Sequence, residues 1–388
     1  MKVLIVADGD TKYGAPHALW HMVTNLQKKA DIDVTVLVNK ESFISGLLKA
    51  GGCRVICVEY EPFYVGYPSH LWKLPFAYIL FGIKYITKRC FLLDSLNHQI
   101  DLQSFDLIHA NSSREDVAAL IAQKYRIPLI WHIREFGDLD YKCFSFRKNY
   151  IKFMNETAYR FIAVSEAVKK HWINKGLDYQ KVTTVYDGVK SRQYSEAKKM
   201  AFYNKPIINL VMTGSIQPTK GQEQAIELLS RLKGQKAKIN LDFIGDGSEK
   251  YMKYLKQKIQ NLNLEDSIRF LGYRNDVFEL LPNYDIGLMC SRCEGFGLVT
   301  VEYMMAGLAV LASDAGANRE LVRDGVDGYL YKYGDIENMK KKFLKIIAEN
   351  LGGEETARYA ALKFSDTVNA DNIYEIYKMV LNQHNYAT

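Results

Sequence analysis

Two glutamates, Glu294 and Glu302, lie eight positions apart on either side of a glycine-rich turn in the segment CEGFGLVTVEY, residues 293–303. We expect a helix to begin near Gly297, with Glu302 in its second turn and Glu294 on the loop before it. The free N–H groups at the start of a helix favour a phosphate, and carboxylates accept hydrogen bonds from hydroxyl groups. This segment therefore predicts a site for a sugar nucleotide.

The neighbours of Glu302 argue against the simpler interpretation, in which both glutamates are ordinary exposed acids. Val299, Val301 and residues 304–306 are all apolar. Because a helix of this kind packs against a core, we expect the Glu302 side chain to be half-buried and to need hydrogen-bonding partners.

The length and composition of the chain indicate a globular protein with two domains. It has 388 residues, of which 48 % are hydrophobic and 24 % are charged. The net charge of +7 favours anionic partners. Its basic residues are dispersed and no recognition motif appears, so we do not expect nucleic acid as a partner. Residues 2–8 read as a first strand without a cleavage site, which predicts a cytoplasmic protein without a signal peptide.

The cysteines are too sparse and irregular for a disulfide framework, so we expect reduced thiols. They are Cys53, Cys57, Cys90, Cys143, Cys290 and Cys293. Cys290 and Cys293 have C-x-x-C spacing, but a zinc site needs a second pair of ligands, and the other close pair is spaced differently. We therefore interpret the pair as structural.

Apolar, β-branched runs alternate with amphipathic helical patterns in the first half of the chain. The predicted strands are Val3–Ala7, Val34–Val38, Arg54–Val58, Asp106–His109, Leu129–Ile133, Phe161–Val164 and Lys181–Val185. Strands that alternate with helices indicate a parallel, doubly wound sheet.

The same alternation begins again after the polar segment 191–205. The predicted strands of the second half are Ile207–Met212, Ile239–Ile244, Ile268–Leu271, Asp285–Met289 and Ala309–Ala312. We therefore predict an α/β protein with two Rossmann-like domains, residues 1–195 and 196–365, which face each other across a cleft at the carboxyl ends of their strands.

With two such sheets around it, segment 294–302 fits the Glu-x7-Glu motif of retaining glycosyltransferases of family 4, which the chain resembles over nearly its whole length. The resemblance implies the GT-B fold, with an acceptor-binding first domain and a nucleotide-sugar-binding second domain. It implies that Glu294 contacts hydroxyls of the donor sugar and that Glu302 holds the nucleotide ribose. It also implies that residues 366–388 form a helix that crosses back to the first domain.

A second segment, GSIQPTKG at residues 214–221, resembles the family stretch whose arginine and lysine neutralise the donor diphosphate. Lys220 stands at the lysine position, whereas Ser215 replaces the arginine. The second positive charge is expected from helix N-termini or from Arg292 or Arg319; otherwise the donor binds more weakly.

The resemblance assigns further residues to the site. His132 ends a predicted strand and matches a position where relatives place a histidine near the donor sugar, so the expected catalytic residues are Glu294, His132 and Lys220. The expected donor-binding residues are Gly14, Ser215, Lys220, Gly245, Tyr273, Arg274, Glu294, Gly295, Phe296, Gly297, Leu298 and Glu302.

The implied reaction moves a hexosyl group from a nucleoside diphosphate sugar, with UDP-sugars as the default, to an acceptor hydroxyl with retention of configuration. No Asp-x-Asp pair ends a strand in the second half, so we expect no metal, and the nucleotide sugar is a co-substrate rather than a cofactor. Two alternatives stay open: a sugar-nucleotide epimerase with the GT-B fold, and a non-catalytic module that binds a sugar nucleotide or a partner.

Residues 62–91 combine many aromatic side chains with four basic ones. Their longest apolar stretch, Leu74–Ile83, is too short to cross a bilayer. A helix of this type can lie on an anionic membrane, or it can pack on the sheet or on a second subunit, and both interpretations stay open. The first fits a lipid-linked saccharide acceptor in a bacterial envelope or capsule pathway, with the protein on the inner face of the membrane.

Overall fold

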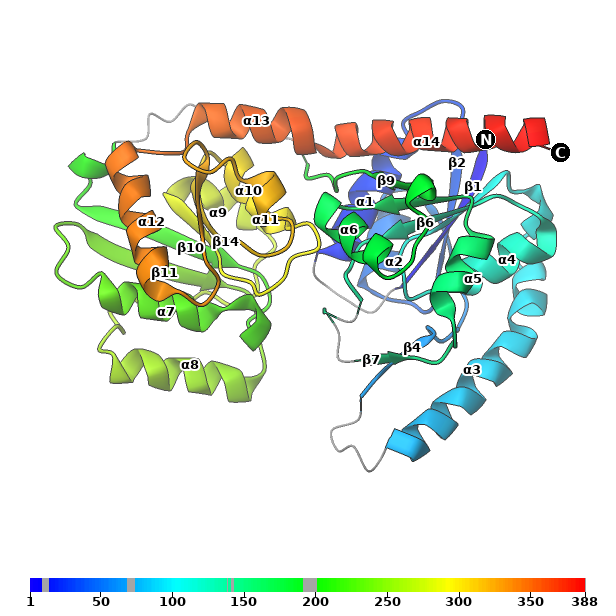
Figure 1. Cartoon of the computed structure of the whole chain (residues 1–388), viewed down its shortest axis with the longest axis horizontal. Helices are drawn as coiled ribbons and strands as arrows, with labels where there is room; N and C mark the ends of the chain where they lie inside the picture. Colours follow the sequence, from blue (N-terminus) through cyan, green and yellow to red (C-terminus); the bar gives the residue numbers. More distant parts are fainter. Residues whose placement is uncertain (9–13, 68–73, 138, 141–142, 191–200, 388) are drawn as a thin grey trace. The chain divides into compact units, whose positions relative to one another are not determined.

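The structure is a computed structural model that describes residues 1–8, 14–67, 74–137, 139–140, 143–190 and 201–387. The chain divides into two compact units (Figure 1). The first consists of Met1–Gly188 together with Asp366–Thr388, and the second is Val189–Ser365. The first division of the chain thus falls at Gly188, slightly before the expected position at residue 195.

The first unit is built on a parallel sheet. Its strands are β1 Lys2–Ala7, β2 Asp33–Val38, β3 Arg54–Cys57, β5 Leu107–Ala110, β6 Leu129–Ile133, β8 Arg160–Ala163 and β9 Val182–Thr184. They lie in the order β3-β2-β1-β5-β6-β8-β9. The strand runs predicted for the first half are all present, because a parallel sheet buries both faces and so needs continuous apolar runs. The order reverses between β1 and β5, which brings the loops after these strands together.

Helices pack around this sheet (Figure 1). They include α1 Ala15–Leu26, α2 Phe43–Ala50, α4 Val117–Tyr125, α5 Tyr150–Thr157, α6 Glu166–Asn174 and α14 Asp366–Ala387. Helix α14 packs beside α1, and its residues Ile373, Tyr377 and Val380 are fully buried in the same hydrophobic cluster as Leu19 and Val23. The last helix of the chain therefore completes the core of the first unit.

Helix α3, Leu74–Asn97, belongs to the first unit and packs against the rest of that unit through one of its faces. Strands β4 Tyr64–Gly66 and β7 Cys143–Ser145 pair antiparallel. Phe146, which follows β7, contacts the rings of Tyr78, Phe81 and Tyr85 of α3. The fully buried Asp116 also accepts a 2.7 Å hydrogen bond from the Tyr85 hydroxyl. The opposite face of α3 carries six apolar side chains that are each more than half exposed: Phe76, Ile79, Leu80, Ile83, Ile86 and Phe91.

The second unit is built on another parallel sheet. Its strands are β10 Ile207–Thr213, β11 Lys238–Ile244, β12 Ile268–Phe270, β13 Ile286–Met289, β14 Ala309–Ser313 and β15 Gly328–Tyr331. They lie in the order β12-β11-β10-β13-β14-β15. Five of these strands coincide with predicted runs, and β15 was not predicted. The order reverses between β10 and β13.

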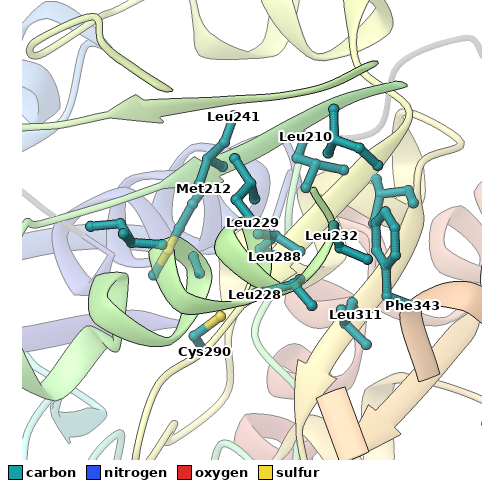
Figure 2. Close-up of a cluster of buried hydrophobic side chains, with 14 of the residues drawn as sticks. Leu210, Met212, Leu228, Leu229, Leu232, Leu241, Leu288, Cys290, Leu311 and Phe343 are labelled. Carbon is teal, nitrogen blue, oxygen red and sulfur yellow. The ribbon is translucent and has the colours of Figure 1, made fainter. Parts of the chain in front are cut away.

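The helices of the second unit are α7 Gln222–Arg231, α8 Glu249–Asn261, α9 Val277–Leu280, α10 Leu298–Met305, α11 Asn318–Leu321, α12 Ile336–Glu349 and α13 Glu354–Phe364. Figure 2 shows the core beneath α7, where Leu228 and Leu229 lie among side chains of the sheet such as Leu210 and Leu288, with Phe343 of α12 closing the cluster. This packing fixes the start of α7, and with it the loop after β10.

None of the helices in the described ranges is both long enough and apolar enough to cross a membrane.

Candidate active site

Lys220 and Glu294 meet where the strand order of the second unit reverses. Lys220 ends the turn of 3₁₀ helix that follows β10, and Glu294 lies on the loop that follows β13. The Nζ of Lys220 lies 2.6 Å from Oε1 of Glu294, and 32 % of the lysine side chain stays exposed, so a ligand can reach the pair. Parallel α/β sheets bind ligands beyond the carboxyl ends of their strands at such a reversal. Two of the residues that the sequence placed in the site are therefore together in the expected position.

Two glycines allow the loops to approach closely enough to form this pair. Gly221 has a φ of +79°, and a Cβ there would lie 2.2 Å from the carbonyl oxygen of Cys290. Gly316 has a φ of +60°, and a Cβ there would lie 2.3 Å from the carbonyl oxygen of Glu294. The N–H of Ala317 donates to that same oxygen over 3.0 Å. Because only glycine accepts both the left-handed backbone and the contact, these positions hold the Lys220 and Glu294 backbones in place.

Glu302 lies in the second turn of α10 and is partly buried, as the sequence predicted. Burial raises the pKa of its carboxyl group to about 7. Among the residues that the structure describes, none forms a hydrogen bond or an ion pair with this carboxylate. A buried carboxylate without partners costs free energy. Hydroxyl groups of a ligand, which donate to carboxylates, would remove that cost.

Two arginines were candidates for the positive charge that is absent at the arginine position of the motif. Arg319 donates to the carbonyl oxygen of Asp314 over 2.7 Å and to its carboxylate over 3.1 Å, so its guanidinium is used locally. Arg292 is exposed, and its backbone N–H donates to the carbonyl oxygen of Thr219 over 2.9 Å, directly beside Lys220. Within the described ranges, the Arg292 guanidinium has no ion pair. Arg292 is therefore the better placed of the two arginines.

The other predicted donor residues of this unit border the same edge of the sheet. Ser215 follows β10, Gly245 follows β11, and Tyr273 and Arg274 follow β12. Arg274 is exposed and its guanidinium pairs with Asp276, so a local acid already balances its charge.

The turn between the two glutamates ends at Gly297, which is the N-cap of α10, and Leu298 is the first residue of this helix. The free N–H groups of α10 therefore follow Gly297, as predicted. Phe296 is 4 % exposed, and its ring contacts the ring of Phe364 edge-on at 5.9 Å between centroids. Its side chain thus supports the turn from the inside, while Gly295 is partly exposed.

His132, the third expected catalytic residue, belongs to the first unit and is fully buried. Its Nδ1 lies 3.2 Å from Nε2 of His109, and Nδ1 of His109 lies 2.6 Å from the Tyr377 hydroxyl. Burial lowers the pKa of His109 to about 3 and the pKa of His132 well below its ordinary value, and the positive charge of Arg134 adds to both effects. Both rings are therefore neutral. The Nε2 of His132 has no hydrogen-bond partner among the described residues.

Gly14, the expected donor contact of the first unit, is exposed and is the N-cap of α1. The residues just before it, 9–13, lie outside the described ranges. Nearby at this edge of the sheet, Arg114 pairs with Asp8 at 3.6 Å, which joins the loops after β1 and β5.

Asn318, which is not among the expected site residues, is fully buried and joins the loops of the site. Its Nδ2 donates to the carbonyl oxygen of Ser313 over 3.1 Å, and its Oδ1 accepts from Thr300 of α10 over 3.3 Å. The Ser313 hydroxyl in turn donates to the carbonyl oxygen of Ser291 over 2.6 Å. The available signal was the pair of serines at neighbouring strand ends, since polar groups that are buried there need partners.

Cys290, the first cysteine of the C-x-x-C spacing, is fully buried. The Cys290 thiol lies in the hydrophobic core under α7 (Figure 2), and burial raises its pKa to about 12. In the part of the chain that the structure describes, no group of three or more His, Cys, Asp or Glu residues could hold a metal ion.

Two family models together match nearly all of the chain. The model for Glycosyltransferase Family 4 matches residues 13–193, and the model for Glycosyl transferases group 1 matches residues 195–363. The change from one model to the other thus falls close to the division between the two units.

Several curated relatives are bacterial glycosyltransferases. The chain is 23 % identical over 389 residues to the N,N'-diacetylbacillosaminyl-diphospho-undecaprenol alpha-1,3-N-acetylgalactosaminyltransferase of Campylobacter jejuni, and the match covers 94 % of this chain and 96 % of the relative. It is 22 % identical to an Escherichia coli UDP-Gal:alpha-D-GlcNAc-diphosphoundecaprenol alpha-1,3-galactosyltransferase, with 75 % and 80 % covered. The match to the putative glycosyltransferase EpsD of Bacillus subtilis is 28 % identical, covers 45 % of this chain and spans less than half, 46 %, of the length of EpsD.

Solved structures share the fold over nearly the whole chain. Anabaena Alr3699/HepE in complex with UDP superposes with a TM-score of 0.76 and 22 % identity, covering 98 % of this chain and 100 % of that one. A glycosyltransferase from Rickettsia africae gives a TM-score of 0.74 at 18 % identity, with 98 % of each chain covered. These likenesses confirm the predicted architecture of two Rossmann-like domains.

Proposed function

Because this chain belongs to the glycosyltransferases of group 1, family 4, we propose that it transfers a hexosyl group from a nucleoside diphosphate sugar to an acceptor hydroxyl with retention of configuration. The proposed donor is a UDP-sugar. The UDP complex of Anabaena HepE, which has the same fold, supports this choice of nucleotide.

The observation that carries the proposal is the Lys220–Glu294 ion pair at the strand-order reversal, with the unpartnered Glu302 carboxylate eight residues further on. In the absence of ligand, each member of the pair neutralises the other. A diphosphate that binds here competes with Glu294 for the Lys220 ammonium. Glu294 is then free to accept hydrogen bonds from hydroxyls of the donor sugar, and Glu302 accepts them from the ribose.

The reaction breaks the bond from the anomeric carbon to the diphosphate oxygen and forms a bond from the same carbon to the acceptor oxygen. Negative charge grows on the leaving diphosphate while the sugar ring gains positive charge, so fixed charges placed for these changes lower the barrier. Lys220, Arg292 and the N-terminus of α10 stabilise the diphosphate, and Glu294 stabilises the sugar. The acceptor attacks from the face that the diphosphate leaves and passes its proton to a phosphate oxygen. No metal takes part in this scheme.

The proposed acceptor is a saccharide or lipid-linked saccharide of bacterial cell-surface polysaccharide synthesis. Two relatives that match most of this chain are named for acceptors linked to diphospho-undecaprenol, which supports a lipid-linked acceptor. Such an acceptor is presented at a membrane, and we propose that residues 62–91, of which 68–73 lie outside the described ranges, make peripheral contact with the inner face of the cell membrane.

The proposal is tested in two steps. Thermal-shift measurements with a panel of nucleoside diphosphate sugars identify the donor, because a bound ligand raises the apparent stability. Transfer from that donor to a diphospho-undecaprenol-linked saccharide is then measured for wild type, Glu294→Ala and Lys220→Ala, with and without a chelator. We expect transfer by wild type alone, with the anomeric configuration kept and no effect of the chelator.

The outcomes separate the alternatives. Donor isomerisation without acceptor would identify an epimerase. If wild type binds nucleotide but turns over no donor with any acceptor, the chain is a binding module. Arg231→Ala is a matched control, because Arg231 also pairs with a glutamate of the second unit, Glu337 of α12, but lies at the end of α7 opposite to Lys220. It should keep wild-type transfer.

A further inference from the structure

The amide side chain of Gln224 joins three loops at the carboxyl ends of the strands of the second unit. Gln224 lies in the first turn of α7, directly after the Lys220 turn. Its Nε2 donates to the carbonyl oxygen of Cys290, which follows β13, over 3.1 Å. Its Oε1 accepts from the N–H of Gly334, after β15, over 2.9 Å, and from the Tyr331 hydroxyl over 3.3 Å. One half-buried amide thus holds the loops after β10, β13 and β15 together.

The next peptide group of the loop after β13 is held as well. Its carbonyl oxygen, that of Ser291, accepts from the Ser313 hydroxyl over 2.6 Å. Its N–H, that of Arg292, donates to the carbonyl oxygen of Thr219 over 2.9 Å. Nδ2 of Asn318 donates to Oγ of Ser313 over 3.3 Å, which leaves the hydroxyl proton for Ser291. Both polar groups of this peptide bond are therefore engaged.

These contacts leave the backbone before Glu294 with little freedom. A peptide group is planar, so the backbone of a residue between two held peptide groups is fixed by their positions. Ser291 stands between two such groups, and the carbonyl oxygen of Glu294 accepts from the N–H of Ala317 over 3.0 Å. Gln224 supplies the side chain that holds the first of the two groups.

The hold on this backbone matters most when a donor is bound. In the structure, Lys220 orients the Glu294 carboxylate, with 2.6 Å between Nζ and Oε1. In the reaction proposed above, the diphosphate of the donor attracts the Lys220 ammonium. Glu294 then loses this partner when it has to accept hydrogen bonds from the sugar. Its orientation now depends on the loop, and a carboxylate that is already in position loses less conformational entropy on binding.

We propose that Gln224 is a positioning residue of the site: through the Cys290 carbonyl, it keeps the loop of Glu294 in the shape that presents the carboxylate to hydroxyls of the donor sugar. The proposal rests on the function proposed above for the same site. Because Gln224 acts through the loop, its removal should weaken the part of the donor affinity that comes from the sugar and spare the part that comes from UDP.

Calorimetric titration of wild type and Gln224→Met tests this with two ligands, UDP and the UDP-hexose that gives the largest thermal shift in the panel above. Methionine has a similar shape but no amide. We expect the affinity for the UDP-hexose to fall about tenfold, as for the loss of one hydrogen bond, and the affinity for UDP to stay within about twofold. Equal losses for both ligands, or no loss for either, would overturn the proposal.

Gln222→Met is the matched control. Gln222 lies in the same turn of α7, and its Nε2 also donates to a loop carbonyl, that of Ser215, over 3.1 Å. Because the motif places Ser215 near the diphosphate, this change should weaken the binding of UDP and of the UDP-hexose by the same factor. A selective loss for the UDP-hexose in this variant would contradict the assignment to the contact between Gln224 and Cys290.

The path through Glu294 is tested by combining Gln224→Met with Glu294→Ala. Once the carboxylate is gone, the loss of the Gln224 amide should have no further effect on the affinity for the UDP-hexose, so the two losses should not add. A merely structural role of Gln224 would lower the thermal stability and give additive losses. Additive losses would therefore overturn the proposal.

The two proposals fail in different ways. Absence of transfer by wild type, together with the selective and non-additive loss, would refute the transferase and leave the role of Gln224 established. Transfer by wild type, with equal losses for both ligands in Gln224→Met, would refute the role of Gln224. If circular dichroism shows that Gln224→Met does not fold, Gln224→Asn takes its place. It keeps an amide but is one methylene group too short for the Cys290 carbonyl, and the same outcomes decide.

Discussion

Glu302 is a carboxyl group whose protonation should control how tightly the protein holds a nucleotide. With a pKa of about 7, it gains a proton just below neutral pH and can then no longer accept two hydrogen bonds from ribose hydroxyls. We expect the affinity for UDP to fall by up to about tenfold per pH unit below pH 7. Calorimetric titration between pH 8 and pH 6 measures this. Glu302→Gln should bind weakly and lose most of this pH dependence; an identical pH profile in both proteins would exclude Glu302 from the site.

The same group makes the stability of the second unit depend on pH. The ordinary pKa of a glutamate is 4.5, whereas the pKa of Glu302 in the folded protein is about 7, so between these values the folded state binds the proton more tightly than the unfolded chain. The free energy of unfolding therefore decreases as the pH rises through this window, by up to about 3 kcal/mol. Urea unfolding of wild type and Glu302→Gln at pH 5 and pH 7.5 checks this. The free energy of unfolding of Glu302→Gln, relative to that of wild type, should be higher at pH 7.5 than at pH 5.

Arg292 and Arg319 allow a matched test of which residue supplies the positive charge that Ser215, at the arginine position of the motif, does not offer to the diphosphate. Arg292 is exposed beside the Lys220 turn, whereas the Arg319 guanidinium is held by Asp314. We expect Arg292→Ala to weaken UDP binding about tenfold, as for the loss of one charge-assisted hydrogen bond, and Arg319→Ala to weaken it much less. The affinities of Arg292→Ala and wild type should differ less for UMP than for UDP, because UMP has one phosphate fewer. Equal losses for both arginines would remove Arg292 from its assigned role.

At the scale of elements, α3 has one packed face and one exposed apolar face. The sequence left open whether this helix packs on protein or lies on a membrane. In the structure, Tyr85 and Phe81 contact Phe146, while Ile79 and Ile83 are exposed. No acidic residue occurs between Glu61 and Asp94. An exposed apolar face in a segment with only positive charges is suited to an anionic bilayer surface.

We therefore expect the protein to bind vesicles that contain anionic lipid. Replacing Ile79 and Ile83 by Gln should weaken binding at least about tenfold, because each isoleucine loses apolar area that the bilayer interface would bury. Vesicle sedimentation measures the partition. The matched control replaces Ile207 and Leu362, which are exposed on the second unit, and should bind as wild type does. If the α3 variant binds vesicles normally but sediments as a smaller oligomer, the face belongs to a contact between subunits.

The elements that the sequence predicted well are those whose pattern is local. Continuous apolar runs predicted the strands of both sheets except β15, and the two motifs named Lys220 and Glu294, which form an ion pair in the structure. Strand β15 was missed because its sequence, GYLY, begins at a glycine and has no β-branched residue, whereas the predicted strands each have at least one. The environment of His132 could not be predicted either, since the Tyr377 hydroxyl that ends its hydrogen-bond chain is 268 residues from His109.

At the scale of the whole molecule, α14 belongs to the first unit although it follows the second in the chain. It buries Ile373, Tyr377 and Val380 completely, and Asn369 donates to the carbonyl oxygen of Tyr186 over 2.7 Å. Each buried side chain contributes about 2 kcal/mol, so their sum is comparable with the stability of a whole domain.

A chain that ends at Ser365 should therefore lose the fold of the first unit and keep that of the second. We expect UDP binding through the second unit to persist in part, with the thermal transition of the first unit absent from calorimetry. The single change Ile373→Ala should lower the transition of the first unit alone. Loss of both transitions together in the truncated chain would mean that the two units do not fold independently.

The place of α14 also sets an order of events during protein synthesis. The first half of the polypeptide leaves the ribosome early, yet one side of its hydrophobic core stays exposed until α14 has been synthesised. The second half has no such gap, because all of its strands and helices are contiguous in the chain. The half that is translated first is thus the last to mature, and it must wait with apolar surface uncovered while the other half folds.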